Sequence, residues 1–248
     1  RDIGLMKEVG ILPVVVHGGG PQIAEKLKNK NIDSKFIEGL RVTDKDTVKV
    51  VEDVLANEIN AEIVKSINES GGKAIGLSGN KNTLISASKL KIEVKDSDSN
   101  IEKIVDIGFV GQPTKVNTNF IKEHIKDGGI PVIAPLGIDD EGNSYNINAD
   151  TAAGFIAGEL EASKLLLLTD VPGILDQDKK LISSLTLDDA SKIIDEDFIV
   201  GGMKPKILTC VEAMKKGVNK TTILDGRIPH SVILELFTEH GIGTQIYS

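Results

Sequence analysis

Cysteine is nearly absent from this chain, and its scarcity excludes several classes of protein. Cys210 is the only cysteine among 248 residues, so no intramolecular disulfide can form and no zinc site can be built on paired cysteines. The apolar residues on both sides of Cys210 indicate a small core residue rather than a nucleophile. A lone thiol also fits a reducing compartment, and we therefore expect the protein in the cytoplasm.

Aromatic residues and long apolar runs are also scarce. The sequence has no Trp and is 3% aromatic, so its core must be assembled mainly from Ile, Val, Leu and Ala. No apolar segment approaches the roughly 20 residues that span a bilayer, and no secretory signal is evident, so we expect no membrane association. With 40% hydrophobic residues, the chain still suffices for one large domain or two lobes.

Positive charge is in deficit. The chain has 29 Lys and Arg residues against 37 Asp and Glu residues, which gives a formal net charge of -8. An acidic chain without a long basic run is a poor candidate for binding nucleic acid. An anionic substrate would instead need Lys, Arg and backbone N–H groups placed locally.

Short apolar runs alternate with amphipathic segments along most of the chain. Runs typical of strands cover residues 11–16, 74–79, 130–135, 165–170, 221–225 and 244–247. Helical patterns cover residues 2–9, 21–31, 45–69, 117–126, 151–161, 191–196, 205–216 and 232–238. Residues 84–110 predict β-hairpins with a turn at residues 97–100, and the unbroken apolar run at residues 165–168 predicts a strand buried on both faces. The alternation predicts an α/β fold, a three-layer αβα sandwich with an open, mainly parallel central sheet.

Three glycines follow the first predicted strand. Gly18, Gly19 and Gly20 let the backbone approach a ligand closely and expose its N–H groups, and a helix that begins at Pro21 would add its positive end. An anion such as a phosphate or a carboxylate fits such a turn. A tight strand-to-helix turn without a ligand explains the same residues equally well, and we expect His17 to have a structural role beside it.

Asn146, Asn148 and Asp150 alternate along a predicted extended segment. Alternate residues of a strand face the same side, so two amides and a carboxylate would line one wall of a substrate site. The competing interpretation is a polar loop that ends in a helix cap at Asp150. Arg41 stands in an otherwise apolar run, where it would either hold a carboxylate in a two-pronged contact or lie on the surface of an edge strand.

Two further segments are suited to a nucleotide. Residues 169–174 place Asp170 and a Pro-Gly turn directly after a strand, which suits a ribose or a base edge but is equally typical of an ordinary turn. Lys206 lies near the start of a predicted helix, where a phosphate would meet both a cation and free N–H groups. Two solvated lysines, Lys204 and Lys206, are the simpler explanation. No Ser-His-Asp order, pair of catalytic carboxylates or His-rich cluster is evident, so we expect no metal site on the protein itself.

Six stretches of the sequence together resemble the amino-acid kinase family. They occur in the family's order and cover nearly the whole chain: residues 17–21 (HGGGP), 39–43 (GLRVT), 146–150 (NINAD), 168–174 (LTDVPGI), 202–206 (GMKPK) and 241–244 (GIGT). The resemblance implies the amino-acid kinase fold. It also implies ATP-dependent transfer of the γ-phosphoryl group to the side-chain carboxylate of N-acetyl-L-glutamate, in arginine biosynthesis, with Mg²⁺ carried by the nucleotide.

Site residues follow from the resemblance, position by position. Gly19 and Gly20 would hold the substrate and the transferring phosphoryl group, Arg41 would bind the α-carboxylate, and Asn146 and Asn148 would help to seat the substrate. Lys206 would stabilise charge on the phosphoryl group, and Asp150 would orient lysine side chains. The ATP-binding residues would be Asp170, Val171, Pro172, Gly173, Ile174, Leu175, Gly201, Gly202 and Met203.

The resemblance also implies an organisation. A first lobe, residues 1–162, would bind the amino-acid substrate, and a second lobe, residues 163–248, would bind ATP on the same continuous sheet. A homodimer is expected and a hexamer is possible. The family begins with a strand that ends in Lys-x-Gly-Gly, and this segment is not among the printed residues, so one of two catalytic lysines is missing from the sequence as written. Two alternatives stay open: a kinase for an aminoadipate-type carboxylate, and a non-catalytic relative that binds a nucleotide or an effector.

Overall fold

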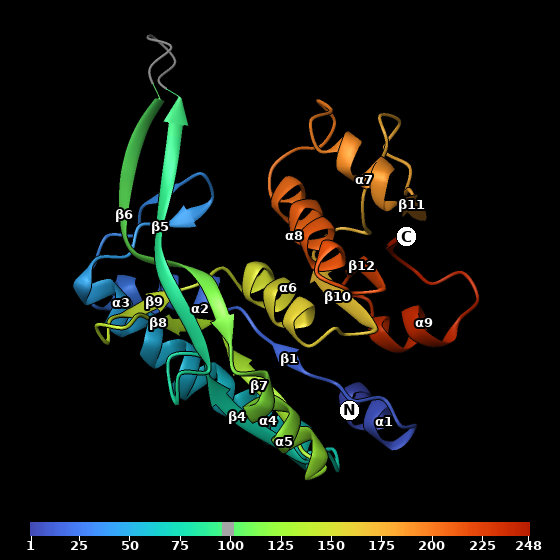
Figure 1. Cartoon of the computed structure of the whole chain (residues 1–248), viewed down its shortest axis with the longest axis horizontal. Helices are drawn as coiled ribbons and strands as arrows, with labels where there is room; N and C mark the ends of the chain where they lie inside the picture. Colours follow the sequence, from blue (N-terminus) through green and yellow to red (C-terminus); the bar gives the residue numbers. More distant parts are fainter. Residues whose placement is uncertain (96–101) are drawn as a thin grey trace. The chain divides into compact units, whose positions relative to one another are not determined.

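The computed structural model describes residues 1–95 and 102–248, which form two compact units (Figure 1). The first unit contains residues 1, 3 and 7–152, and the second contains residues 2, 4–6 and 153–248. The turn expected at residues 97–100 lies outside the described residues. None of the described helices has the length and apolar character that crossing a membrane requires.

The first unit is built on a small parallel sheet. After α1 (Asp2–Glu8), which is divided between the units, its elements are β1 (Val15–Val16), α2 (Gly20–Asn29), β2 (Phe36–Ile37), β3 (Leu40–Arg41), α3 (Lys45–Glu52), η1 (Asp53–Ile59), α4 (Asn60–Glu69), β4 (Ala74–Ser78), β5 (Ile85–Lys95), β6 (Glu102–Val116), α5 (Thr118–Lys126), β7 (Ile130–Ala134), β8 (Leu136–Ile138) and β9 (Ser144–Asn146). The sheet order is β1-β7-β4, with all strands parallel. Every residue of the central strand β7 is buried, so both faces of the sheet are covered.

The predicted helix over residues 45–69 is continuous but not uniform. The side chain of Asp44 caps it by accepting hydrogen bonds from the backbone N–H groups of Asp46 and Thr47, which confirms the predicted start. The bonds from Thr47 and Asp46 also hold the pKa of Asp44 below its ordinary value. Between α3 and α4 the chain forms the π-helix η1, whose wider turn no apolar periodicity had indicated.

One long hairpin replaces the several hairpins expected over residues 84–110. Figure 1 shows β5 and β6 as an extended two-stranded arm, drawn in green. At the base of the arm, β8 and β9 close a four-stranded ring in the order β5-β6-β9-β8. The ring places β9, which carries Asn146, directly beside β6 and β8.

The second unit has a mainly parallel sheet with helices on both faces. Its elements are α6 (Ala149–Glu159, which begins in the first unit), β10 (Lys164–Thr169), β11 (Ser184–Thr186), α7 (Leu187–Ile193), α8 (Met203–Lys215), β12 (Lys220–Asp225), α9 (Ser231–Phe237) and β13 (Thr244–Tyr247). The strand order is β10-β12-β13-β11, and only the β12–β13 pair is antiparallel. Along β12, Thr221 contacts Met214 of α8, whereas the next residue, Thr222, contacts Glu235 of α9. Alternate residues therefore face opposite helices.

Three local predictions were wrong. The strand expected at residues 11–16 is only two residues long. The helix expected at residues 191–196 is α7, which starts at Leu187 because Thr186 exchanges hydrogen bonds with Asp189 and caps it. The apolar run in β10 is not buried on both faces, since Leu165 and Leu167 are buried but Leu168 is 48% exposed.

Candidate active site

The glycine turn, residues 18–20, leaves the carboxyl end of β1 and starts α2. Gly19 is the N-cap of α2, and Pro21 lies in its first turn. A Cβ atom on Gly19 would lie 2.4 Å from Ile59 Cδ1 and 2.8 Å from Leu55 Cδ2, so only glycine fits against η1. Within residues 1–95 and 102–248, no hydrogen-bond acceptor pairs with the backbone N–H groups of the three glycines. Unpaired N–H groups at a helix N-terminus are suited to an anion.

Arg41 lies beside this turn and is buried, with 7% of its surface exposed. Its Nη2 donates to the carbonyl oxygen of Gly20 at 3.0 Å, its Nη1 donates to Ser34 Oγ, and its guanidinium lies 4.7 Å from the centre of the Phe36 ring. The interpretation as a surface arginine is therefore wrong. Burial lowers the pKa of Arg41, and among the described residues it forms no salt bridge. A buried cation without a carboxylate partner favours an anionic ligand.

The segment from Asn146 to Asp150 does not stay extended. The strand β9 ends at Asn146, and α6 begins at Ala149, so Asp150 lies within the first turn of a helix. The cap is Asn148, whose Oδ1 accepts from Thr151 N at 3.1 Å and from Thr151 Oγ1 at 3.3 Å. The prediction that Asp150 caps this helix was wrong, and so was the single wall of three alternating side chains.

The start of α6 lies against the glycine turn. A Cβ atom on Gly18 would be 3.6 Å from the Cβ of Ala149, which is ordinary van der Waals contact. The structure of the first unit thus brings together the turn, Arg41 and the N-terminal residues of α2 and α6. The two helix termini and the guanidinium all favour negative charge at this place.

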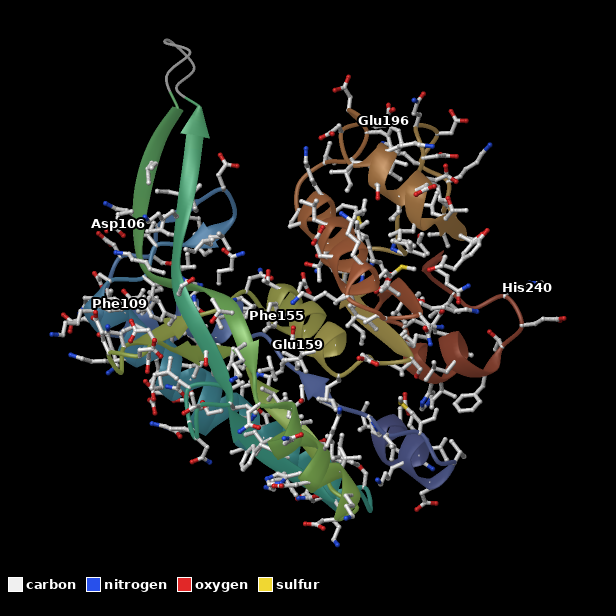
Figure 2. The ribbon with its side chains drawn as sticks, viewed as in Figure 1. Asp106, Phe109, Phe155, Glu159, Glu196 and His240 are labelled. Atoms are coloured by element: carbon white, nitrogen blue, oxygen red, sulfur yellow. The ribbon has the colours of Figure 1, made fainter. Side chains whose placement is uncertain are left out.

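Supporting contacts hold β9 in position. Asn80, which follows β4, is buried and donates to Ser144 Oγ at 2.9 Å. The hydroxyl of Tyr145 donates to Asp139 Oδ2 at 2.9 Å, and burial together with Asp139 raises the pKa of Tyr145 to about 12. Phe109, labelled in Figure 2, packs its ring 6.0 Å from that of Tyr145. The two residues of β9 that precede Asn146 are therefore held in place by neighbouring side chains.

In the second unit, residues 170–175 form a turn that follows β10, and Thr244 holds it. The backbone N–H of Ile174 donates to Thr244 Oγ1 at 2.8 Å, and Ile174 is fully buried. Gly173 has a φ of +151° and its Cβ position lies 2.6 Å from the same hydroxyl, so a side chain there would be both strained and crowded. Asp170 is exposed at the start of this turn.

A carboxylate–arginine pair stands at the carboxyl end of the neighbouring strand β12. Arg227 donates to both carboxylate oxygens of the buried Asp225, from Nε at 2.9 Å and Nη2 at 2.8 Å. The hydrogen bonds from Arg227 lower the pKa of Asp225. Gly226 N donates to Thr169 O at 2.8 Å and ties the ends of β10 and β12 together.

The N-terminus of α8 contains or adjoins four of the predicted site residues, Gly201, Gly202, Met203 and Lys206. Gly201 has a φ of +59°, and Gly202 is the N-cap. The first turn of α8 contains no acidic residue. It does contain Lys204, which forms an exposed ion pair with Asp195 at 2.9 Å. The backbone N–H groups at the N-terminus of a helix favour an anion, so this terminus also has the character of a phosphate site.

Some residues that shape the candidate binding sites had no recognisable signal in the sequence. Ser34 and Phe36 hold Arg41 from a short hairpin, and Asn60, at the start of α4, contacts His17 directly before the glycine turn. Thr244 lies in residues 241–244, one of the six stretches that resemble the family, but no role could be predicted for it. Arg227 directly follows a strand end, and this position is the one signal that could have identified it.

Comparison with known proteins identifies the family of the chain. Residues 1–225 match the amino acid kinase family, and the chain belongs to that family. Among its relatives are proteins named acetylglutamate kinase. The one from Rhodospirillum centenum is 54% identical over 246 residues, which cover 99% of this chain and 81% of the relative. The one from Rhodopseudomonas palustris is 52% identical over 247 residues, or 100% of this chain and 83% of the relative.

Solved structures show the same fold. An N-acetylglutamate synthase from Neisseria gonorrhoeae, complexed with coenzyme A and N-acetyl-glutamate, has a TM-score of 0.83 at 27% identity. All of this chain aligns with it, but this chain spans only 54% of the synthase. The protein smu.665 from Streptococcus mutans has a TM-score of 0.81 at 30% identity, with 99% of this chain and 89% of that chain covered. The predicted fold class, an α/β amino-acid kinase fold with a parallel sheet and helices on both sides, is confirmed.

Proposed function

We propose that this chain transfers the γ-phosphoryl group of ATP to the side-chain carboxylate of N-acetyl-L-glutamate, as a step of arginine biosynthesis. The observation that carries the proposal is the buried guanidinium of Arg41 beside the unpaired N–H groups of the glycine turn. The relatives that are 52–54% identical over 99–100% of this chain indicate which carboxylate substrate fits. We also propose a cytoplasmic location, which the single cysteine of the chain favours.

In the first unit, different residues are proposed to bind the two ends of the substrate. Arg41 binds the α-carboxylate in a two-pronged contact, and the N–H groups of Gly19 and Gly20 receive the carboxylate end and the incoming phosphoryl group. Asn146 and Asn148 seat the amide portion. The cap bond uses only the Oδ1 of Asn148, so its Nδ2 remains a donor for the substrate.

In the second unit, the proposed roles concern ATP. Residues 170–175 hold the nucleoside part, and Gly201, Gly202 and Met203 hold the phosphates at the N-terminus of α8. Lys206 neutralises charge on the phosphoryl group. For Asp150, which belongs to the first unit, the proposed role is to orient lysine side chains. Within the described residues, no three His, Cys, Asp or Glu side chains form a metal-ligand set, so the Mg²⁺ of a nucleotide would rely on the phosphates for its ligands.

The proposed reaction needs little general acid or base catalysis from the protein. The attacking group is already a carboxylate, so no proton has to be removed before its oxygen bonds to phosphorus and the bond to the leaving ADP breaks. Transfer requires the two bound substrates to meet in line. Positioning and neutralisation of charge then provide most of the rate.

The test is ADP formation by the full chain with ATP, Mg²⁺ and either N-acetyl-L-glutamate or N-acetyl-L-aminoadipate. We expect turnover that depends on acetylglutamate and a clearly lower kcat/KM for the longer substrate. Equal or better use of the aminoadipate compound would contradict the proposed substrate, and binding of both ATP and acetylglutamate without turnover would contradict an enzyme. A homodimer is proposed for the same protein, and light scattering of the purified chain measures it.

A further inference from the structure

A single buried side chain, that of Asn60, contacts all three strands of the β1-β7-β4 sheet or the residue that follows them. Asn60 is 4% exposed. Its Nδ2 donates to Val132 O of β7 at 2.9 Å, approaches Leu77 O of β4 at 3.4 Å, and lies 3.1 Å from Nε2 of His17, which follows β1. The facing carbonyl oxygens accept only, so the nitrogen of the amide must point toward them, and the orientation of Asn60 is determined.

This orientation fixes the proton on His17. Because the amide nitrogen of Asn60 donates, the Nε2 that it meets has to accept, and the proton of a neutral imidazole must then be on Nδ1. The Nδ1 atom lies 3.1 Å from the carbonyl oxygen of Gly18 and donates to it. His17 is 7% exposed, and burial lowers its pKa more than the bond to Gly18 raises it, so the ring is neutral at pH 7.

The bond from His17 also determines where the next N–H group points. In a planar trans peptide the C=O of one residue and the N–H of the next point in opposite directions. With the Gly18 carbonyl held toward the buried ring, the N–H of Gly19 is directed away from it. On the other side, Leu55 and Ile59 of η1 occupy the space where a Cβ atom of residue 19 would lie.

We propose that His17 and Asn60 are positioning residues that hold the Gly18–Gly19 peptide in the orientation that presents the Gly19 N–H to an anionic ligand. Asn60 sets the tautomer, His17 holds the carbonyl, and the N–H of Gly19 makes the contact. The catalytic consequence rests on the proposed function, since it assumes that the ligand is the transferring phosphoryl group. The tautomer and the peptide orientation are properties of the unliganded protein.

The first experiment therefore uses the wild-type chain without substrates. Nitrogen-15 NMR of the imidazole rings distinguishes a protonated Nδ1 from a protonated Nε2, and the His17→Asn variant identifies the His17 signals among those of the four histidines. We expect His17 to be neutral and protonated at Nδ1 at pH 7. Protonation at Nε2, or a cationic ring at this pH, overturns the proposal whatever the chain catalyses.

The second experiment compares two variants that each retain half of the imidazole. The amide nitrogen of His17→Asn occupies the Nδ1 position and can still donate to Gly18. The amide of His17→Gln reaches the Nε2 position, where its oxygen can accept from Asn60, and leaves no donor to Gly18. We expect the Asn variant to keep most of the kcat and the Gln variant to lose about 10- to 100-fold, with a smaller change in the acetylglutamate KM. A role in filling space predicts the reverse order, because Gln is closer to His in size.

The outcomes separate this inference from the proposed function. If the wild type lacks acetylglutamate-dependent turnover, the proposed function fails while the NMR result still decides the tautomer. If the wild type is active and both variants fold but lose kcat equally, or Asn loses more than Gln, the positioning role is wrong. If either variant fails to fold, the NMR measurement decides alone, with the His17 signals assigned in the wild type by sequential assignment of its backbone.

Discussion

At the scale of single residues, the two candidate anion sites are defined by cations in unusual surroundings. Arg41 is buried and forms no salt bridge within the described residues, whereas Lys206 lies in a helix that has no acidic residue in its first turn. Burial of Arg41 without a salt-bridge partner among the described residues is unfavourable for folding alone. Residues that cost stability in this way are typical of functional sites.

The first prediction concerns the shape of the Arg41 side chain. In Arg41→Lys the charge stays, but the planar fork that reaches both Gly20 and a carboxylate is lost. We expect the acetylglutamate KM to rise about 10-fold or more while kcat changes little, since a charged hydrogen bond is worth roughly 1.5–3 kcal/mol. Steady-state kinetics with acetylglutamate varied at saturating ATP measure the change. An unaltered acetylglutamate KM would remove Arg41 from the substrate site.

The second prediction concerns Lys206 and has an internal control. Lys206→Ala should lower kcat on the order of 100-fold with a small effect on acetylglutamate affinity, because the lysine charge matters most in the transition state. Lys204→Ala, in the same helical turn, should have little effect, since Lys204 forms an exposed ion pair with Asp195. Equal losses in both variants would indicate damage to α8 rather than loss of a catalytic charge.

Among residues, sequence patterns identified those whose surroundings are local. The glycine turn and Arg41 stand out because glycine repeats and an arginine within an apolar run are visible over a few positions. Asn60 is not visible in this way, since it resembles any polar residue of an amphipathic helix. Its importance arises from contacts with His17, Leu77 and Val132, which only the folded chain brings together.

At the scale of elements, the positions of helix ends decide what the polar side chains can do. Both Asn148 and Asp150 have the chemistry of an N-cap, and sequence alone could not choose between them. The end of β9 at Asn146 makes the choice, because it leaves two residues for the turn into α6. The choice matters for function, since the cap bond uses the oxygen of Asn148 and leaves its nitrogen for a ligand.

The third prediction separates the two roles of Asn148, which are to cap α6 through Oδ1 and to donate to a ligand through Nδ2. In Asn148→Asp the side chain keeps an oxygen that can cap α6 but loses the Nδ2 donor. We expect the melting temperature to stay within about 2 °C, since Asp and Asn cap nearly equally well, and the acetylglutamate KM to rise about 10-fold. Calorimetry and kinetics on one preparation measure both. A large drop in melting temperature would mean that the contribution of Asn148 is mainly structural.

At the scale of the whole molecule, several ionisable groups have their pKa shifted in the same direction. Burial favours the neutral form of Glu235, but its hydrogen bonds from Ile242 N and Lys164 Nζ more than compensate, and the pKa of Glu235 is lowered. Hydrogen bonds likewise lower the pKa of Asp44, and burial lowers that of His17. All of these groups bind protons more readily in the unfolded chain than in the folded one.

The fourth prediction follows from the sign of these shifts. Where the unfolded state binds more protons, stability falls as pH falls. The contribution of neutral His17 should be complete above its ordinary pKa of about 6.5 and decline as pH drops below that value, and the carboxylates should follow below about pH 4.5. Urea unfolding between pH 8 and pH 4 measures the profile. The His17→Asn variant should lose the part of the profile that begins as pH falls below about 6.5, and an unchanged profile would show that His17 does not contribute.

The π-helix η1 has a consequence for how this chain can change over time. Each bond of η1 spans one residue more than a bond of an α-helix, so removing one residue would let the whole of residues 45–69 become a regular α-helix. Because the wide turn absorbs the extra residue, that repair would leave α3 and α4 facing as they do now, with Asn60 in place. The same deletion inside α3 would instead turn every later side chain by about 100°. Descendants of this sequence can therefore lose one residue of η1 but not one of α3.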